Sequence, residues 1–455
     1  MPLKFVFGPS GSGKSTYLYQ HVIEESEKYP LKNFIVLVPE QFTMQTQKDL
    51  VSMHPRHGIM NIDVLSFARL AYRVFEETGT KQMQVLDDEG KNLILRKIAG
   101  DYENKLTVLK GNIKKLGYIS EVKSVISEFT QYDIGEEEMD EMLDHLDEDS
   151  RLYYKLKDIR LLYEGFQDYL RERYITKEEL LDVLNSQVKE SELLKNSVVV
   201  LDGFTGFTPV QNRLILELMW CCKEVWVTVT MDERENPYAY KHPYQLFGLS
   251  KQMVTTLVRM AGEDHIEVEE PVCLYGYPVK RFEKNKELAF LERNIFRYGS
   301  GRYDKAVENL EIHAAGNPRQ EADAVAEGIR RLVRKEQYRY RDIGVIVSDM
   351  NVYGDYLEQA FENYGIPVFM DHKRSILLNS FVEYIRSLLN MAEKNFSYES
   401  VFRFLRTNLA GFACEEVDEL ENYVLGLGIR GYKGWQNRWI RRLKGMEEEE
   451  LDRLN

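Results

Sequence analysis

The sequence has few cysteines and no long apolar run, and these absences exclude several classes of protein. Its 455 residues include four cysteines, and none forms a CxxC pair, so a disulfide framework or a zinc site is not expected. The first residues, MPLKFVFGPSGSGKS, lack the apolar core of a signal peptide, and no later stretch reaches the roughly 18 apolar residues of a membrane span. We therefore expect a cytoplasmic protein that makes no membrane contact.

Positive charge is also in deficit. The chain has 60 Lys and Arg against 74 Asp and Glu, which gives a net charge of −14. A protein of this charge has no overall field that attracts nucleic acid, so any DNA contact requires a local basic groove. The shares of hydrophobic residues (44%) and charged residues (29%) are those of ordinary globular proteins and disfavour disorder. The length allows about three domains.

A glycine-rich loop near the amino terminus carries the strongest functional signal. An apolar run at 3–7 precedes the loop and a helical pattern at 15–23 follows it, which is the setting of a phosphate-binding loop with the spacing GxxxxGK(S/T). We expect its backbone N–H groups to bind the phosphates of ATP, Lys14 to neutralise them, and Ser15 to ligate Mg²⁺. The predicted site residues are Gly8, Pro9, Ser10, Gly11, Ser12, Gly13, Lys14 and Ser15.

A second element of this site is predicted at Asp202, which follows the apolar run 197–201. Phosphate-binding loops use a carboxylate at the end of a neighbouring strand for the Mg²⁺ shell, although an isolated Asp after a strand is equally typical of a simple turn. The next residue is Gly203, where hydrolytic members of this class usually have a Glu that orients the attacking water. The sequence thus supports ATP binding better than ATP turnover.

Alternating strand and helix patterns predict an α/β fold with parallel sheets. We expect a first domain from 1–82 and 195–305, interrupted at 83–194 by a helical insertion without strands, and Ser66 as the N-cap of a helix. The region 306–378 starts a second α/β domain, and 379–455 is a further helical insertion that is truncated. The predicted strands are 3–7, 33–38, 62–65, 197–201 and 224–230 in the first domain, and 310–315, 343–347 and 365–370 in the second.

Six blocks of sequence, in order, resemble one protein family. They are GPSGSGKST at 8–16, VLVPEQFTMQ at 36–45, NIDVLSFARLAYRVF at 61–75, LDGFTGFTPVQ at 201–211, NPRQEADAVAEGIRRLV at 317–333 and DIGVIVSDMNVYGDYLEQAFENYGIPVF at 342–369. The chain resembles the amino-terminal part of the AddB family, whose members pair with AddA in the bacterial helicase/deoxyribonuclease AddAB and are relatives of superfamily 1 helicases. The resemblance extends over all 455 residues, and members of the family continue well beyond this length.

The resemblance implies two RecA-like domains, with ATP and Mg²⁺ as cofactors, in a heterodimer with an AddA-type subunit that drives unwinding. It also implies that the complex is an ATP-dependent deoxyribonuclease that processes double-strand DNA ends and single strands for recombinational repair. The full-length subunit adds a 5′→3′ exonuclease and recognition of the Chi sequence. The nuclease region and a 4Fe-4S cluster are expected in the C-terminal part of the subunit, beyond this segment. Motors of this superfamily carry an Arg where this chain has Ser348, so the motor itself is expected to be inactive.

The cysteines and a basic aromatic segment each allow a simpler interpretation. Cys221, Cys222, Cys273 and Cys414 do not match the family's cluster ligands and are expected to be small buried hydrophobes. Aromatic and basic residues alternate near the end of the chain, which is typical of single-strand binding, but helical spacing predicts a packed aromatic stripe and is favoured. These residues are Trp435, Arg438, Trp439, Arg441, Arg442 and Lys444.

Two other functions remain open at this stage. A P-loop NTPase or kinase that acts alone would also use the loop at 8–15, but it has no need of the second α/β block. A nucleotide-gated scaffold without catalysis is the other alternative, and it agrees with the residues found at positions 203 and 348.

Overall fold

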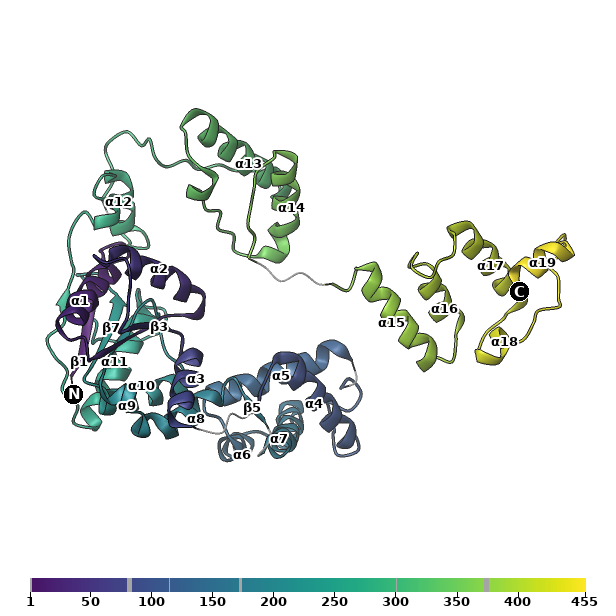
Figure 1. The fold of residues 1–455 in the computed structure, drawn as a ribbon, viewed down its shortest axis with the longest axis horizontal. Helices are drawn as coiled ribbons and strands as arrows, with labels where there is room; N and C mark the ends of the chain where they lie inside the picture. The colour runs from purple at the N-terminus through teal and green to yellow at the C-terminus, as the bar shows by residue number, and fades with distance from the viewer. Residues whose placement is uncertain (1, 80–83, 114, 172–173, 300, 372–375) are drawn as a thin grey trace. The chain divides into compact units, whose positions relative to one another are not determined.

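The computed structural model describes the whole chain except residues 1, 80–83, 114, 172–173, 300 and 372–375. The chain forms two compact units, 1–311 and 312–455 (Figure 1).

Unit 1 is built on a six-stranded sheet in which all neighbouring strands run parallel, in the order β3-β2-β6-β7-β1-β8. This confirms the α/β class. The strands are β1 (Leu3–Gly8), β2 (Asn33–Leu37), β3 (Ile62–Leu65), β6 (Ser197–Leu201), β7 (Glu224–Thr230) and β8 (Val272–Cys273). The first five lie where the sequence predicts them. The two-residue β8 was not predicted, because so short a segment shows no periodicity.

Alternating side chains of each strand enter two different cores, which explains why the strands are apolar on both faces. On β6, Val198 and Val200 contact the core under α1 (Lys14–Lys28) and α2 (Thr43–Met53). Val199 and Leu201 contact the core on the opposite face. The helices of that face are α3 (Phe67–Thr78), α8 (Leu180–Gln187), α10 (Pro209–Cys221) and α11 (Gly248–Glu263).

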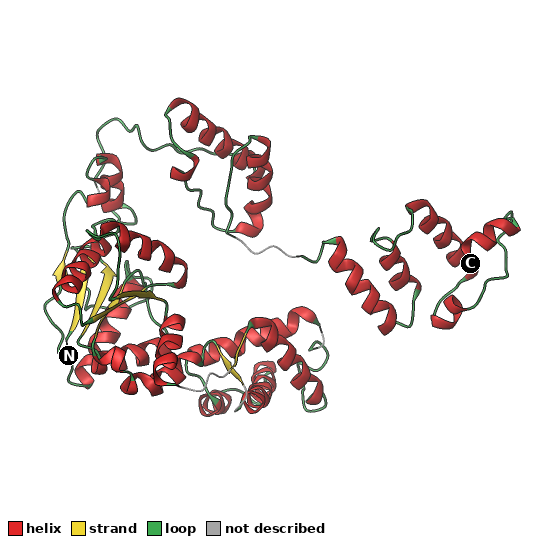
Figure 2. Ribbon diagram, viewed as in Figure 1, coloured by secondary structure: helices red, strands yellow, loops and turns green. Residues whose placement is uncertain are grey.

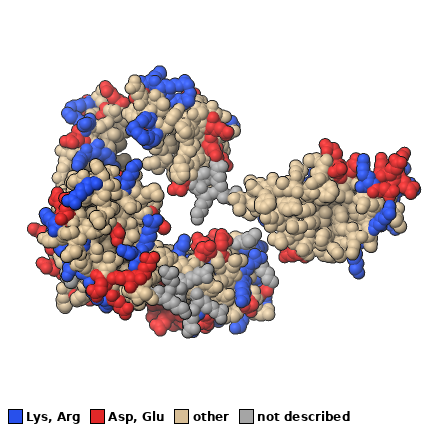
Figure 3. Space-filling view, in the orientation of Figure 1, with Lys and Arg blue, Asp and Glu red and all other residues tan. Residues whose placement is uncertain are grey.

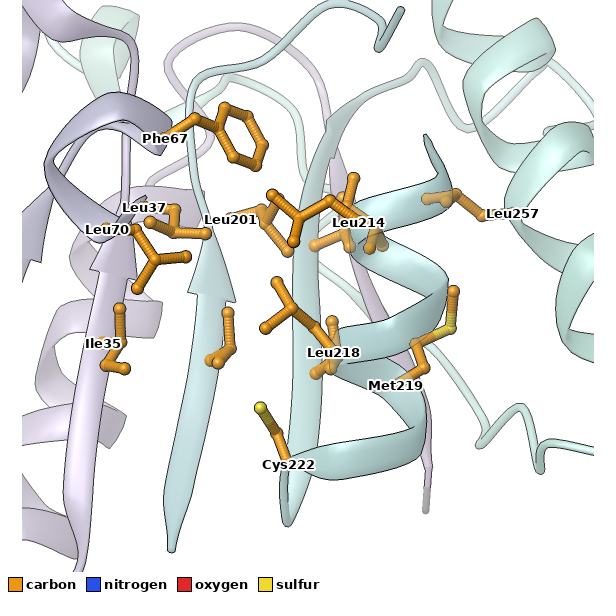
Figure 4. Packing of buried hydrophobic residues seen from close by; sticks show 14 of the residues in the cluster. Ile35, Leu37, Phe67, Leu70, Leu201, Leu214, Leu218, Met219, Cys222 and Leu257 are labelled. Atoms are coloured by element: carbon orange, nitrogen blue, oxygen red, sulfur yellow. The ribbon is translucent and has the colours of Figure 1, made fainter. Parts of the chain in front are cut away.

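Figure 4 shows this second core, where Leu214, Leu218 and Met219 of α10 pack toward the strands. The helix α3 begins as predicted, because Ser66 Oγ accepts a hydrogen bond from Arg69 N at 3.4 Å. The helix α8 packs on α3 and α10, so the chain from Ile175 onward contributes to the core of the sheet rather than to the insertion.

The insertion has a separate core that runs from Leu86 to Leu170 and is mainly helical. Its helices are α4 (Asp88–Asp101), α5 (Leu116–Gln131), α6 (Glu136–Asp144) and α7 (Arg151–Leu170). The short α9 (Glu192–Lys195) belongs to the core of the sheet through Leu194. The prediction that this region has no strands was wrong, because β4 (Gln84–Leu86) and β5 (Tyr174–Thr176) form a parallel pair. The two segments are nearly 90 residues apart, and three residues each are too few to give a strand pattern.

Unit 2 contains helices but, over the residues described in 312–455, no strand (Figure 2). The helices α13 (Pro318–Lys335) and α14 (Met350–Asn363) pack together through a small apolar core. The remaining helices are α15 (Ser380–Glu393), α16 (Tyr398–Leu405), α17 (Cys414–Leu427), α18 (Tyr432–Gln436) and α19 (Glu448–Leu454).

The predicted strands at 310–315, 343–347 and 365–370 are therefore not formed. Large apolar side chains in these segments are exposed to solvent: Ile312 is 100% exposed, Ile346 98% and Phe369 90%. A strand requires a neighbour that pairs with its backbone N–H and C=O groups, and among the described residues these segments have none. The periodicity was therefore wrong for these three segments, and the second RecA-like domain remains a prediction.

Candidate nucleotide-binding site

The predicted site residues come together at the carboxyl ends of the parallel strands. The loop after β1, Asp202 after β6 and Thr228 and Thr230 of β7 border a cavity of about 520 Å³. Ligands of parallel α/β sheets bind at this edge, because loops from neighbouring strands meet there. The lining residues are Ser10, Gly11, Gly13, Lys14, Ser15, Thr16, Asp202, Gly203, Phe204, Thr205, Thr228, Thr230, Lys280 and Arg281.

The loop itself depends on its glycines. Gly11 and Gly13 have φ values of +84° and +96°, a backbone region that disfavours residues with a Cβ. A Cβ on Gly11 would lie 2.7 Å from Arg281 Cβ, and a Cβ on Gly8 would lie 2.4 Å from Ser12 Oγ. The strand–loop–helix arrangement expected for 3–23 is present. The conformation of the loop favours glycine at the glycine positions of the motif.

The start of α1 offers unsatisfied donors to the cavity. The N-cap Gly13 supplies no side-chain hydrogen bond, and no acidic residue lies in the first turn of the helix. Ser12 Oγ is buried with no hydrogen-bond partner. A helix N-terminus with free N–H groups and the positive end of the helix dipole favours an anion. The residues therefore fit a phosphate group.

Lys14 is positioned by the loop that it serves. Its Nζ donates hydrogen bonds to Gly8 O at 2.8 Å and Pro9 O at 3.0 Å. Burial lowers the pKa of Lys14 to about 8, an effect that Arg281 increases and that Asp202 and Glu292 oppose. The negative charge of a bound phosphate would raise the pKa of Lys14 again and favour its charged form.

Asp202 is 5% exposed, and both of its carboxylate oxygens accept hydrogen bonds. Tyr19 Oη donates to Oδ2 at 2.7 Å, and Thr228 Oγ1 donates to Oδ1 at 2.6 Å. Burial, and then the negative charge of Asp202, raise the pKa of Tyr19. Two neutral hydroxyls therefore fix the carboxylate in an orientation that faces the cavity.

Sequence reasoning missed the two residues that orient Asp202 and the two additional cations of the cavity. Tyr19 lies one turn of α1 after Ser15, and Thr228 is a polar residue within the apolar strand EVWVTVT, so each left a weak signal. Lys280 and Arg281, from the 3₁₀ turn Lys280–Phe282, left none, because they are more than 260 residues from the loop in sequence. Arg281 N donates to Gly11 O at 3.0 Å, which holds the turn against the loop.

Gly203 has φ +80°, and its N–H donates to Thr228 Oγ1 at 3.4 Å. A Glu at this position would have to adopt a left-handed backbone conformation that side chains with a Cβ rarely take. The backbone conformation at position 203 therefore disfavours a Glu, and the absence of a carboxylate agrees with the local backbone geometry.

The affinity for ATP should fall as the pH rises through 8. Bound phosphates favour charged Lys14, so above its pKa of about 8 in the free protein binding requires uptake of a proton. From pH 7 to pH 9 the charged fraction falls about tenfold, and we expect a dissociation constant about tenfold higher. Isothermal titration calorimetry at both values measures it. A Lys14→Arg control, which does not titrate in this range, should show a flat profile, and a flat profile in the parent would contradict the prediction.

Metal ions and iron–sulfur clusters are held in proteins by characteristic sets of donor side chains. Within the described part of the chain, no group of three or more His, Cys, Asp or Glu side chains is arranged to hold a metal ion. Cys222 is buried, Cys221 half-buried, and Cys273 and Cys414 exposed, so the expectation that all four are buried was wrong for the last two. These residues do not fit an iron–sulfur cluster.

No helix in the described residues is both long and apolar enough to cross a bilayer.

Comparisons with known proteins agree with the resemblance seen in the sequence. The family profile described as "ADDB, N-terminal" matches residues 5–292. The B subunit of the ATP-dependent helicase/deoxyribonuclease of Lachnoclostridium phytofermentans is 44% identical over 100% of this chain and 40% of its own length. The proteins of the same name from Caldanaerobacter subterraneus subsp. tengcongensis and Clostridium acetobutylicum are 36% and 32% identical, also over 100% of this chain.

The chain thus spans about 40% of the length of the curated relatives it matches. Since the profile covers more than half of the chain and describes the amino-terminal region, the chain belongs to the AddB family and corresponds to its N-terminal part.

Proposed function

We propose that the chain is the ATP-binding region of an AddB-type subunit that works with an AddA-type partner on double-strand DNA ends. The observation that carries this proposal is the convergence of the glycine loop, Lys14 and Asp202 with Lys280 and Arg281 around one cavity. The relatives are named as subunits of ATP-dependent helicase/deoxyribonucleases, which supports ATP as the ligand and DNA as the substrate of the complex.

The residues of the cavity divide into two groups by charge. Lys14, Lys280 and Arg281 supply positive charge for the phosphates, together with the N–H groups at the start of α1. Ser15 and Asp202 are the oxygen donors that would hold Mg²⁺, and the ion would neutralise charge on the phosphates. Tyr19 and Thr228 orient Asp202 and remain protonated donors.

The site favours binding over hydrolysis. Asp202 is already engaged by two hydroxyls, and Gly203 places no carboxylate near a water that could attack the γ-phosphate. We therefore propose a nucleotide-gated scaffold in which bound ATP fixes the loop, α1 and the turn Lys280–Phe282 relative to one another. This proposal assigns nuclease activity and the 4Fe-4S cluster to the remaining part of the longer protein. It assigns Chi recognition to the full-length subunit, which works in the cytoplasm.

The experiment that tests the proposal combines binding with a DNA assay. The purified 455-residue chain should bind ATP in the presence of Mg²⁺, and end-labelled duplex incubated with both should remain full-length and annealed. Two-metal nuclease chemistry needs converging carboxylates, and the described residues offer no such group beyond the nucleotide cavity. Shortening or separation of strands that follows the chain through purification would refute the proposal, as would phosphorylation of a small acceptor, which would favour a kinase.

A further inference from the structure

The segment 430–444 of unit 2 is strongly basic within an acidic protein. It contains six Lys or Arg residues and no Asp or Glu, whereas the whole chain has a net charge of −14. The six are Arg430, Lys433, Arg438, Arg441, Arg442 and Lys444. A local concentration of one charge against the average of the chain marks a candidate contact with a polyanion.

Buried aromatic residues hold this segment in place. Trp435 Nε1 donates to Phe396 O at 3.1 Å, and Trp439 Nε1 donates to Gly434 O at 2.9 Å. Both indoles pack against the core formed by α15 to α19, as the packed interpretation predicted, but α18 ends at Gln436, so the two tryptophans do not share a helix. The fully buried Tyr423 donates its hydroxyl to Arg441 O at 2.6 Å and fixes the backbone at the centre of the basic run.

The cations themselves point away from this core. All six basic residues are exposed, and Arg438 forms an ion pair with Asp452 at 2.8 Å. The other five have no ion-pair partner among the described residues. Figure 3 shows Lys and Arg in blue and Asp and Glu in red on one face of the molecule, where the two signs are interspersed. Trp435 and Trp439 are packed, and Tyr432, which is 51% exposed, is the exposed aromatic residue of the segment, so the surface offers mainly charge.

We propose that the segment 430–444 is a docking surface for the phosphate backbone of a nucleic acid, which it binds without reading bases. The inference rests on the proposed function insofar as that function places DNA beside this protein. Four consecutive glutamates, Glu447–Glu450, follow the basic segment closely. A broad anionic membrane would repel them while it attracts the arginines, whereas a nucleic-acid backbone is a narrow line of charge that can engage the cations alone.

The test removes two adjacent cations and compares them with a matched pair. Arg441→Gln with Arg442→Gln changes only side chains, so the hydrogen bond to Arg441 O is retained. The control is Arg334→Gln with Lys335→Gln, two adjacent exposed cations at the end of α13 that carry the same charge. Fluorescence anisotropy measures binding of a labelled duplex and a labelled single strand across a range of NaCl concentrations.

For the parent, the logarithm of affinity should fall linearly with the logarithm of salt concentration. The Arg441/Arg442 variant should bind at least about tenfold more weakly at low salt, and its slope should be smaller by about 1.8 for duplex or about 1.4 for single strand, since each phosphate contact contributes about 0.9 or 0.7. The control variant should retain the parental slope. Near-ultraviolet circular dichroism of the tryptophans should be unchanged, which shows that the packing around the segment persists.

Other outcomes overturn the inference. Equal behaviour of the two variants would mean that the segment has no special role, while the proposed role of the chain at DNA would stand. A parent that binds no DNA at any salt concentration would overturn the inference, while the ATP-binding role, which calorimetry tests separately, would stand. Binding to vesicles of anionic lipid that is lost in the Arg441/Arg442 variant, with unchanged binding of DNA, would assign the surface to a membrane instead.

Discussion

ATP turnover by this chain should stay at least about 10³-fold below that of an active helicase motor, with or without DNA. The expected deficit follows first from Gly203, which offers no carboxylate to orient water. It follows also from the resemblance to superfamily 1 motors, which implies an Arg for the γ-phosphate at the position where this chain has Ser348. An arginine in that role contributes about 10³–10⁵ in rate. Steady-state phosphate release from the purified chain, measured with saturating ATP and single-stranded DNA, gives the turnover number.

The Gly203→Glu variant is the informative control for this prediction. The φ of +80° at Gly203 disfavours any residue with a Cβ, so the new carboxylate should not be placed productively and turnover should not rise. A turnover number in the range of active motors, retained through purification and lost in Lys14→Ala, would contradict the assignment of a nucleotide-binding scaffold.

Replacement of Lys14 by Ala should abolish measurable ATP binding, with a loss of affinity of at least about 100-fold. The substitution removes a partly buried cation whose Nζ lies at the loop carbonyls of Gly8 and Pro9 and which lines the cavity with Asp202. It removes no apolar core volume, so the thermal unfolding temperature should change by no more than a few degrees. Calorimetric titration with ATP and Mg²⁺ measures the affinity.

Arg281→Ala provides a graded comparison in the same cavity. Arg281 is one of two additional cations and its backbone contact with Gly11 O remains in the variant, so a loss of about tenfold is expected rather than a complete one. If Lys14→Ala binds ATP as tightly as the parent, the glycine loop has been misassigned. If Arg281→Ala alone leaves the affinity unchanged, the side chain of Arg281 takes no part in binding.

The predictability of the fold differed between the two units for a physical reason. The five longer strands of unit 1 could be predicted because their parallel neighbours lie within the same unit, so local apolar patterns and tertiary pairing agree. The segments 343–347 and 365–370 have the same local pattern of apolar residues as those strands. A local pattern, however, does not show whether a partner strand is present. Hydrogen-bonded pairing is not local, and sequence periodicity therefore predicted strands where the structure has exposed extended chain.

A similar division separates the residues of the site. The loop at 8–15 could be predicted from one short motif, because its phosphate-binding groups are contiguous in sequence. Asp202 was predicted only because the loop required a carboxylate from another strand. Lys280 and Arg281 could not be predicted, since their place at the cavity depends on how the chain returns after β8.

The exposed extended segments of unit 2 also determine how a solution of this chain behaves. Ile346 and Phe369 lie on segments whose backbone N–H and C=O groups have no strand partner in the described residues, and such segments can pair with a second copy of the same chain. Pairing of this kind is second order in protein concentration and does not depend on nucleotide. Light scattering at several protein concentrations therefore measures the oligomeric state of the chain at which ligand binding is studied.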